Sequence, residues 1–175
     1  SMEGEKMDKA KKAVARLVEN LKTGDRMGLV SYSEFASLDT SPSEMSDSAK
    51  RRFIGRVNHL IPGGATNMGD GIRTGANALA SIKQIGRPAR VVLISDGLAN
   101  RGPTSLGALR ALATNALANG VAVTTIGVGT DFNEADQLFF DQIVEEAIRD
   151  ESLRQAAEVN PLDKFQLLFI QVLES

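Results

Sequence analysis

The sequence predicts a doubly wound α/β protein with an open, mostly parallel sheet flanked by helices. Two apolar runs rich in β-branched residues, at 90–95 and 121–128, are typical of parallel strands that are buried on both faces. The segments before and between them carry apolar residues at helical spacing, so helices and strands alternate along the chain. Such alternation implies parallel pairing with right-handed crossovers. At 175 residues the chain is long enough for one such domain with a sizeable core.

The apolar periodicity predicts four helices and one further strand. The helices are expected at 5–22, 46–60, 68–83 and from Pro103 to Asn119. The further strand is expected at 26–33, before a loop that contains Ser41-Pro42-Ser43. The helix residues expected to face the core are Met7, Ala10, Val14, Leu17, Val18, Leu21, Phe53, Val57, Leu60, Ile72, Ala76, Leu79, Leu106, Leu109, Leu112 and Leu117.

The composition of the chain changes near residue 133. Residues 1–130 hold 17 of the 20 basic and 11 of the 22 acidic residues, whereas residues 131–175 hold 3 basic and 11 acidic residues. Five of the seven phenylalanines also lie in those last 45 residues. We therefore divide the chain into a domain at 1–133 and an acidic helical extension at 134–175 that packs on it.

Several classes of function are disfavoured by composition. The net charge of −2 argues against a general nucleic-acid binder. No apolar run approaches the roughly 20 residues needed to cross a bilayer, and no secretory signal is visible, so we expect no membrane association and slightly favour the cytoplasm. The chain has no cysteine, which excludes disulfides and thiolate metal sites.

We expect no enzymatic activity, because no paired nucleophile and base and no cofactor loop is visible. His59 is the only histidine and is expected to be a solvated residue near the end of a helix. Gly127-Val128-Gly129 begins a dinucleotide-binding pattern, but Phe132 occupies the place of the third glycine, which disfavours a nucleotide enzyme.

Two polar loops carry a resemblance to a known family. Gly63-Gly64-Ala65-Thr66-Asn67 precedes a predicted helix, and Leu93-Ile94-Ser95-Asp96-Gly97 ends a predicted strand. They resemble the threonine and aspartate loops of von Willebrand factor type A domains, which have a Rossmann-like sheet. Residues 1–7 look like the tail of the family's Asp-x-Ser-x-Ser-Met motif, and residues 127–133 resemble the end of its fifth strand. The resemblance covers about residues 1–133.

The resemblance implies a metal-ion-dependent adhesion site at the carboxyl edge of the sheet. Thr66 would be a direct ligand through its hydroxyl, Asp96 would bind directly or through water, and Ser1 would be the last serine of the first loop. These oxygen ligands suit Mg²⁺, with Mn²⁺ or Ca²⁺ as alternatives. An open coordination position would accept an acidic side chain of a protein partner, as in cell adhesion.

This chain departs from the family pattern at its start. It begins at the last serine of the first motif, so the motif's Asp and first Ser, and the strand that carries them, are not in the sequence. The alternative reading is therefore a degenerate, fragmentary or fused scaffold with no metal binding and no defined activity.

In the family the missing strand lies between the strands at 26–33 and 90–95. Buried backbone groups left unpaired there would cost about 1–3 kcal/mol each, so the gap must be closed. The choices are direct pairing of the two strands, a strand from a second chain, or the apolar stretch at 165–173. A helix start at Asn160-Pro161 and apolar residues at helical spacing favour a helix at 162–173. We therefore expect a homodimer or a rearranged sheet.

The extension carries a second resemblance. Residues 135–146 and 160–165 look like a helical segment near the C-terminus of type I restriction-enzyme R subunits. The resemblance implies that the chain is a fusion or a gene fragment. Apolar residues on one helical face, Phe139, Ile143, Ala147 and Ile148, predict that 135–157 is mainly helix and that no regular strand follows Asn133.

Overall fold

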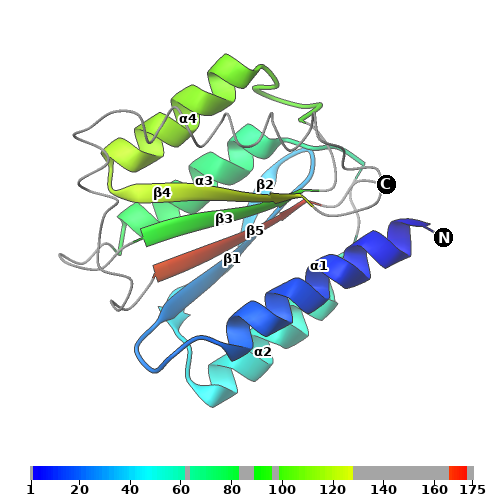
Figure 1. Ribbon diagram of the computed structural model, residues 1–175, viewed down its shortest axis with the longest axis vertical. Helices are drawn as coiled ribbons and strands as arrows, with labels where there is room; N and C mark the ends of the chain where they lie inside the picture. Colours follow the sequence, from blue (N-terminus) through cyan, green and yellow to red (C-terminus); the bar gives the residue numbers. More distant parts are fainter. Residues whose placement is uncertain (1, 62–63, 83–88, 96–98, 128–165, 173–175) are drawn as a thin grey trace.

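A computed structural model describes residues 2–61, 64–82, 89–95, 99–127 and 166–172. Within these ranges, one five-stranded sheet has the order β2-β1-β5-β3-β4 and lies between two layers of helices (Figure 1). The strands are β1 (Arg26–Tyr32), β2 (Ala36–Glu44), β3 (Ala89–Ser95), β4 (Val121–Gly127) and β5 (Gln166–Val172). The helices are α1 (Met2–Glu19), α2 (Asp47–Asn58), α3 (Met68–Ala80) and α4 (Leu106–Ala118). The β1–β2 pairing is antiparallel and the others are parallel, which confirms the predicted α/β class.

Three of the helices begin at side-chain caps. Ser46, Asn67 and Ser105 accept hydrogen bonds from the backbone N–H groups three residues ahead, at 3.3, 3.1 and 3.2 Å. Each cap satisfies one of the N–H groups that the first turn of a helix leaves without an intrahelical partner. The caps therefore set where α2, α3 and α4 begin.

Neighbouring residues of β1 and β3 point into opposite cores. The core under α3 and α4 receives Val30, Tyr32, Val91 and Leu93 from these strands. The core under α1 and α2 receives Met27, Leu29, Val92 and Ile94. Burial on both faces explains why these strands read as continuous apolar runs. Of the helix residues predicted to face the core, Leu17, Leu60, Ala76, Leu106 and Leu112 are partly buried and the others are buried.

The expectation of a helix at 162–173 is wrong for residues 166–172, which form the central strand. β5 pairs in parallel with β1 from Arg26↔Gln166 to Tyr32↔Val172, and with β3 from Ala89↔Gln166 to Ile94↔Gln171. The prediction that no strand follows Asn133 is wrong for the same reason. The gap is closed within one chain, so the expected homodimer loses the reason on which it rested.

The physical reason is that tertiary context outweighs local periodicity. A short apolar run cannot be assigned to a buried strand or a buried helix from its spacing alone. As a helix, this segment would leave the facing backbone groups of β1 and β3 without partners. As a strand, it satisfies both rows at once. The predicted helix at 135–157 and the proposed junction at 133 lie outside the described residues and stay predictions.

A second correction concerns the loop expected around Ser41-Pro42-Ser43, which belongs to the edge strand β2. The antiparallel register shifts between Met27 and Leu29 and again between Leu29 and Val30. Bulges and proline are tolerated on an edge strand, where they also discourage pairing with other chains. The strand was missed because its exposed, polar sequence lacks the apolar alternation of a half-buried strand.

Removing β5 tests its place in the sheet. A chain that ends at residue 165 should lose cooperative thermal unfolding, because unpaired buried groups at about 1–3 kcal/mol each would exhaust the roughly 5–15 kcal/mol of a typical domain. A chain that ends at residue 172 keeps β5 and should unfold like the full chain. Circular dichroism and amide exchange in β1 and β3 measure the effect. Equal melting temperatures for the two truncations would contradict the assignment.

Candidate functional site

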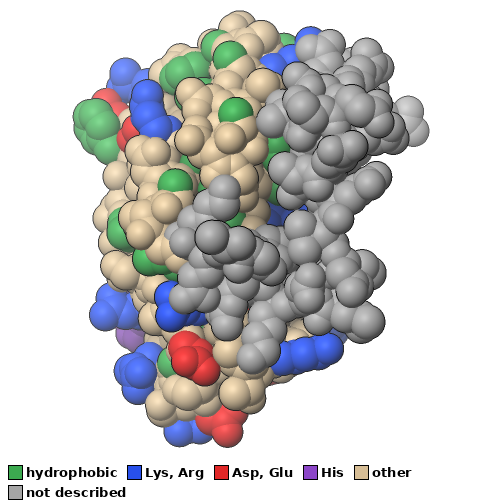
Figure 2. Space-filling model, turned by 90° about the vertical axis from the view of Figure 1, so that its left-hand side faces the viewer, with side chains coloured by type: hydrophobic (Ala, Val, Ile, Leu, Met, Phe, Trp, Pro, Cys, Tyr) green, Lys and Arg blue, Asp and Glu red, His purple; other side chains and the backbone are tan. Residues whose placement is uncertain are grey.

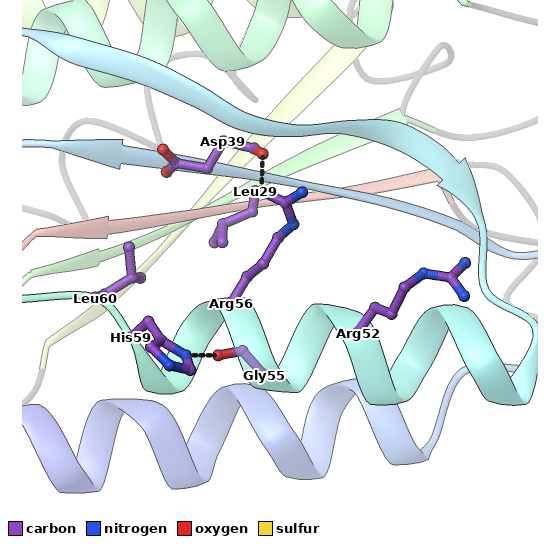
Figure 3. A pocket seen from close by; sticks show the side chains of 7 residues that line it. All are labelled: Leu29, Asp39, Arg52, Gly55, Arg56, His59 and Leu60. Atoms are coloured by element: carbon purple, nitrogen blue, oxygen red, sulfur yellow. Dashed lines mark hydrogen bonds between the residues drawn. The ribbon is translucent and has the colours of Figure 1, made fainter.

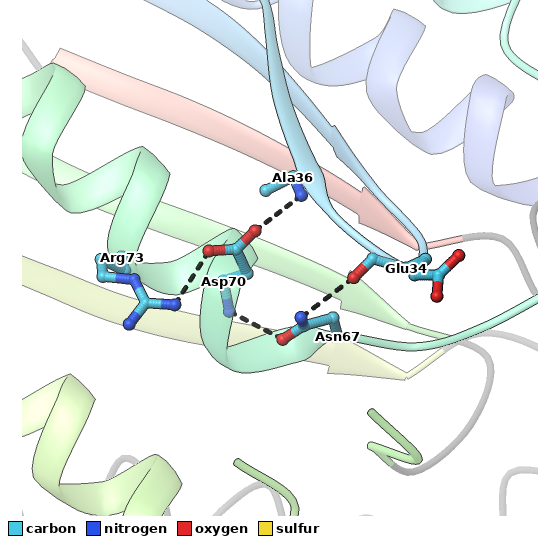
Figure 4. Close-up of polar contacts among 5 residues, drawn as sticks. All are labelled: Glu34, Ala36, Asn67, Asp70 and Arg73. Atoms are coloured by element: carbon cyan, nitrogen blue, oxygen red, sulfur yellow. Dashed lines mark hydrogen bonds and ion pairs between the residues drawn. The ribbon is translucent and has the colours of Figure 1, made fainter. Parts of the chain in front are cut away.

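Loops from three parts of the chain meet at the carboxyl edge of the sheet, where β1 and β3 end. Asn67, just before α3, contacts the turn that follows β1. Its backbone N–H donates to the Ser33 carbonyl at 2.8 Å, and its side-chain Nδ2 donates to the Glu34 carbonyl at 3.0 Å. Figure 4 shows this amide between the turn and the first turn of α3. Asn67 therefore connects the threonine loop to the β1–β2 turn.

Thr66 connects the same loop to the segment that follows β3. Its side chain is buried, and its backbone N–H donates to Asn100 Oδ1 at 2.7 Å. Its carbonyl accepts from the backbone N–H groups of Asn100 and Arg101 at 3.2 and 3.3 Å. Asn100 and Arg101 thus lie on the threonine loop at this edge. Ser1 and Asp96 are outside the described residues, so the approach of Asp96 to Thr66 stays a prediction.

Asp70 supports this edge from the first turn of α3. Its carboxylate accepts from the Ala36 N–H at 2.8 Å and from Arg73 Nη2 at 2.9 Å (Figure 4). The Ala36 N–H, followed by the Arg73 guanidinium, lowers the pKa of Asp70 below its ordinary value of 3.8. The carboxylate therefore ties α3 to the start of β2, in addition to its favourable place near the positive end of the helix dipole.

The outer rim of the edge combines charge with an exposed aromatic ring. Glu34 and Arg101 form an ion pair at 2.8 Å between the turn after β1 and the loop after β3. Phe35 is 74% exposed. Its neighbours Glu34 and Ala36 both bind side chains of the α3 start, so the ring is presented from a well-anchored turn.

A protein-family model described as von Willebrand factor type A domain matches residues 1–157. The chain belongs to the von Willebrand factor type A family. The match agrees with the resemblance found in the threonine and aspartate loops, and with the parallel sheet and its helices.

Known proteins similar to this von Willebrand A domain support the same assignment. A UPF0353 protein of Mycolicibacterium paratuberculosis is 27% identical over 179 residues, which cover 97% of this chain and 51% of that protein. The chain therefore spans about half the length of this relative.

Two solved structures share the fold. The conserved hypothetical protein BatB from Bacteroides thetaiotaomicron aligns with a TM-score of 0.61 and 16% identity, over 97% of this chain and 80% of that chain. An aerotolerance-related membrane protein from Bacteroides fragilis aligns with a TM-score of 0.60 and 20% identity, over 88% of this chain and 86% of that one. In the present domain, the described helices include none with the length and apolar character needed to span a bilayer.

Of the three predicted metal ligands, Thr66 is the one that lies among the described residues. The described part of the domain contains no group of three or more His, Cys, Asp or Glu residues able to hold a metal. The Glu34 and Asp70 carboxylates of this edge are bound to Arg101 and Arg73. The other two predicted ligands, Ser1 and Asp96, lie outside the described residues. The metal site therefore stays a prediction.

Sequence reasoning missed the residues that hold the loops together. Asn100 and Arg101 bind Thr66, and Gly102 lies against the Asn67 side chain with a φ of +64°. A signal was present in Asn100-Arg101-Gly102-Pro103, because asparagine, glycine and proline are typical of tight turns. Their partners across the edge could not be read from the sequence.

Substitution of Asp70 by asparagine should lower the free energy of unfolding by about 1–2 kcal/mol at neutral pH, because two charge-assisted hydrogen bonds are weakened. Folding lowers the pKa of Asp70, so its ionised form stabilises the folded state above the ordinary value of 3.8. The stabilisation is lost as the pH falls through the lowered pKa. The difference between wild type and Asp70→Asn in urea unfolding should shrink over that range.

Asp47→Asn is the matched control, because Asp47 is also an acidic residue in the first turn of a helix. It should lose only the interaction with the helix dipole, about 0.3–1 kcal/mol. An Asp70→Asn difference that persists unchanged far below pH 3.8 would contradict the role of the carboxylate.

Gly102→Ala should destabilise the domain by about 1–3 kcal/mol, because a Cβ at positive φ is strained and would collide with the Asn67 side chain. Gly55→Ala in α2 is the contrasting substitution, since a Cβ there meets nothing within 4 Å. It should stabilise by about 0.5–1 kcal/mol through helix propensity. Thermal unfolding measures both changes, and a neutral Gly102→Ala would disprove the close approach.

Proposed function

We propose that this domain is a protein-binding module whose contact surface is the carboxyl edge of its sheet. The observation that carries the proposal is the joining of three loops through Thr66 and Asn67, by backbone and side-chain hydrogen bonds. Such bonds hold the loops in one arrangement before a partner arrives, which reduces the ordering cost of binding. Ligands of open α/β sheets collect at this edge.

The residues on the outer rim of this edge favour a protein, and not a small molecule, as the ligand. The Phe35 ring is exposed beside the ion pair of Glu34 and Arg101. Aromatic and arginine side chains are enriched among residues that dominate binding energy at protein interfaces. A partner that covers this rim would bury the ring and meet charges of both signs.

In the finer form of the proposal, Mg²⁺ assists binding. Ser1, Thr66 and Asp96 would hold the ion, which would supply a Lewis-acidic position for a carboxylate of the partner. The alternative is a scaffold that binds no metal. This alternative is favoured because the carboxylates of Glu34 and Asp70 already form ion pairs with Arg101 and Arg73. Asp96 is then the one anionic ligand in the proposed set.

Binding without catalysis is the third part of the proposal. The chain has no cysteine, and its single histidine, His59, is exposed at the end of α2, where its ring contacts the Gly55 carbonyl. Within the described residues, His59 is therefore not hydrogen-bonded to a nucleophile.

The melting temperature in excess MgCl₂ and in EDTA tests the metal-assisted form. An ion bound only by the folded state at about 100 times its Kd stabilises by about 2.7 kcal/mol. For a domain of this size, each kcal/mol raises the melting temperature by about 2–4 °C. Wild type should therefore show a clear magnesium-dependent rise, and Thr66→Val and Asp96→Asn should each abolish most of it.

Thr114→Val is the matched control, because Thr114 is exposed on α4 and the substitution removes the same hydroxyl. It should keep the full magnesium response. No response in wild type would contradict metal assistance and favour the metal-free scaffold. A response that Thr66→Val retains would place the ion elsewhere.

A further inference from the structure

A second candidate site lies away from the carboxyl-edge loops, in a groove between α2 and strands β1 and β2. The groove has a volume of about 520 Å³. Its lining residues are Leu29, Asp39, Arg52, Gly55, Arg56, His59 and Leu60 (Figure 3). We propose that this groove binds an anionic group, a carboxylate or a phosphate, carried on a short apolar stem. The proposal does not depend on the function proposed for the loops, with which the groove shares no residue.

Two arginines form the cationic wall of the groove. Arg52 and Arg56 are four residues apart and therefore lie on the same side of α2. Both are exposed. The ion pairs that the described residues make join Arg73 to Asp70 and Arg101 to Glu34, and neither includes these two arginines. Neither guanidinium group of the groove therefore forms an ion pair with a described carboxylate.

Asp39 also lines the groove, but its carboxylate is engaged by the sheet. Asp39 is the extra residue of a bulge in β2. Its neighbours Leu38 and Thr40 pair with Val30 and Leu29, which are consecutive in β1. Its Oδ2 accepts the Ser31 N–H at 2.8 Å.

Arg56 meets the backbone of this bulge rather than the acid. Arg56 Nη1 donates to the Asp39 carbonyl at 3.2 Å, and Figure 3 shows the Asp39 carboxylate directed away from it. The bulge therefore positions Arg56 while leaving most of its five N–H donors for a ligand.

The surrounding charge favours an anion. Helix α2 carries four basic residues, Lys50, Arg51, Arg52 and Arg56, and one acidic residue, Asp47. Figure 2 shows Lys and Arg side chains, with some Asp and Glu side chains among them, over the lower part of the molecule, where Figure 1 places α1 and α2. An anion that approaches α2 therefore meets a net positive helix.

His59 and two leucines complete the groove. Since the Gly55 carbonyl can only accept, His59 Nδ1 donates to it, at 2.7 Å. In the neutral ring Nε2 is then an acceptor, so the arginines, and not His59, are the donors for an anion. Leu60 is partly buried and gives the lining apolar surface beside the cations, and the fully buried Leu29 lies beneath it. Gly55 contributes no side chain, and a Cβ there would enter open space.

This combination defines the class of ligand. Guanidinium groups bind carboxylate and phosphate through paired, charge-assisted hydrogen bonds. The volume lies within the roughly 300–1,000 Å³ typical of small-molecule sites. Leucine surface next to the arginines fits an organic anion better than an inorganic one.

Titration of the full chain with phenyl phosphate, phenylacetate and 2-phenylethanol tests the proposal, followed by NMR shifts of the Gly55 amide and by calorimetry. At least one anion should bind, and the neutral alcohol should not. The preferred anion identifies the ligand as a phosphate or a carboxylate. Arg52→Gln and Arg56→Gln should each lower the affinity for that anion about tenfold, which is the loss expected for one charge-assisted hydrogen bond.

Arg51→Gln is the matched control, because Arg51 is the exposed neighbour of Arg52 on α2 and does not line the groove. It changes the net charge equally and should alter affinity by about twofold or less. Gly55→Leu should block the groove at constant charge, whereas Gly107→Leu, at a helix glycine with equally open space, should not.

If Arg51→Gln and Arg52→Gln lower the affinity equally, the anion is held by general electrostatic attraction and the proposed site is wrong. Binding of the alcohol as strong as that of the anions, or no binding by either anion, would also overturn it. The melting temperature of each variant shows whether it folds, and Gly55→Leu tests the groove without loss of an arginine. Thr66→Val should leave anion binding unchanged, which separates this test from that of the carboxyl edge.

Discussion

The pairing of β5 between β1 and β3 is the interaction on which the remaining structure depends. Its backbone pairs with β1 from Arg26 to Tyr32 and with β3 from Ala89 to Ile94. These two strands supply residues to both cores, so their separation and register position α1 and α2 on one face and α3 and α4 on the other. The same register aligns the carboxyl ends of β1 and β3, where Thr66 and Asn67 connect the loops.

Much of the fold could be predicted because local and tertiary preferences agree. The Val91 to Ile94 run and the helix stripes containing Val14, Phe53 and Ile72 have the periods of the structures they form. The failures occur where the two preferences disagree. β2 is a polar edge strand with a proline, and β5 has apolar residues at helical spacing but lies where two rows of backbone groups require a strand.

The candidate site was predictable at the level of loops and less so at the level of contacts. The threonine loop and its family could be recognised because glycine, threonine and asparagine occur in a specific order at 63–67. The bond from Thr66 to Asn100 and the brace from Asp70 to Ala36 join residues that are 34 positions apart. Such contacts arise only when the sheet has brought the loops together, so no local pattern encodes them.

The central place of β5 also determines when the domain can fold during synthesis. β5 ends at the carboxyl edge of the sheet, level with Tyr32, and α1 begins at the same edge (Figure 1). In space, β5, α1 and β1 therefore form a βαβ crossover. In the chain, however, β5 is made after α1 and β1. At roughly 5–20 residues per second, the ribosome needs on the order of 4–15 s to extend the chain from the end of β3 to the end of β5. During that interval β1 and β3 present unpaired edges, which are templates for association with other chains. Until its central strand emerges, the nascent domain therefore exposes backbone groups with which another chain can pair.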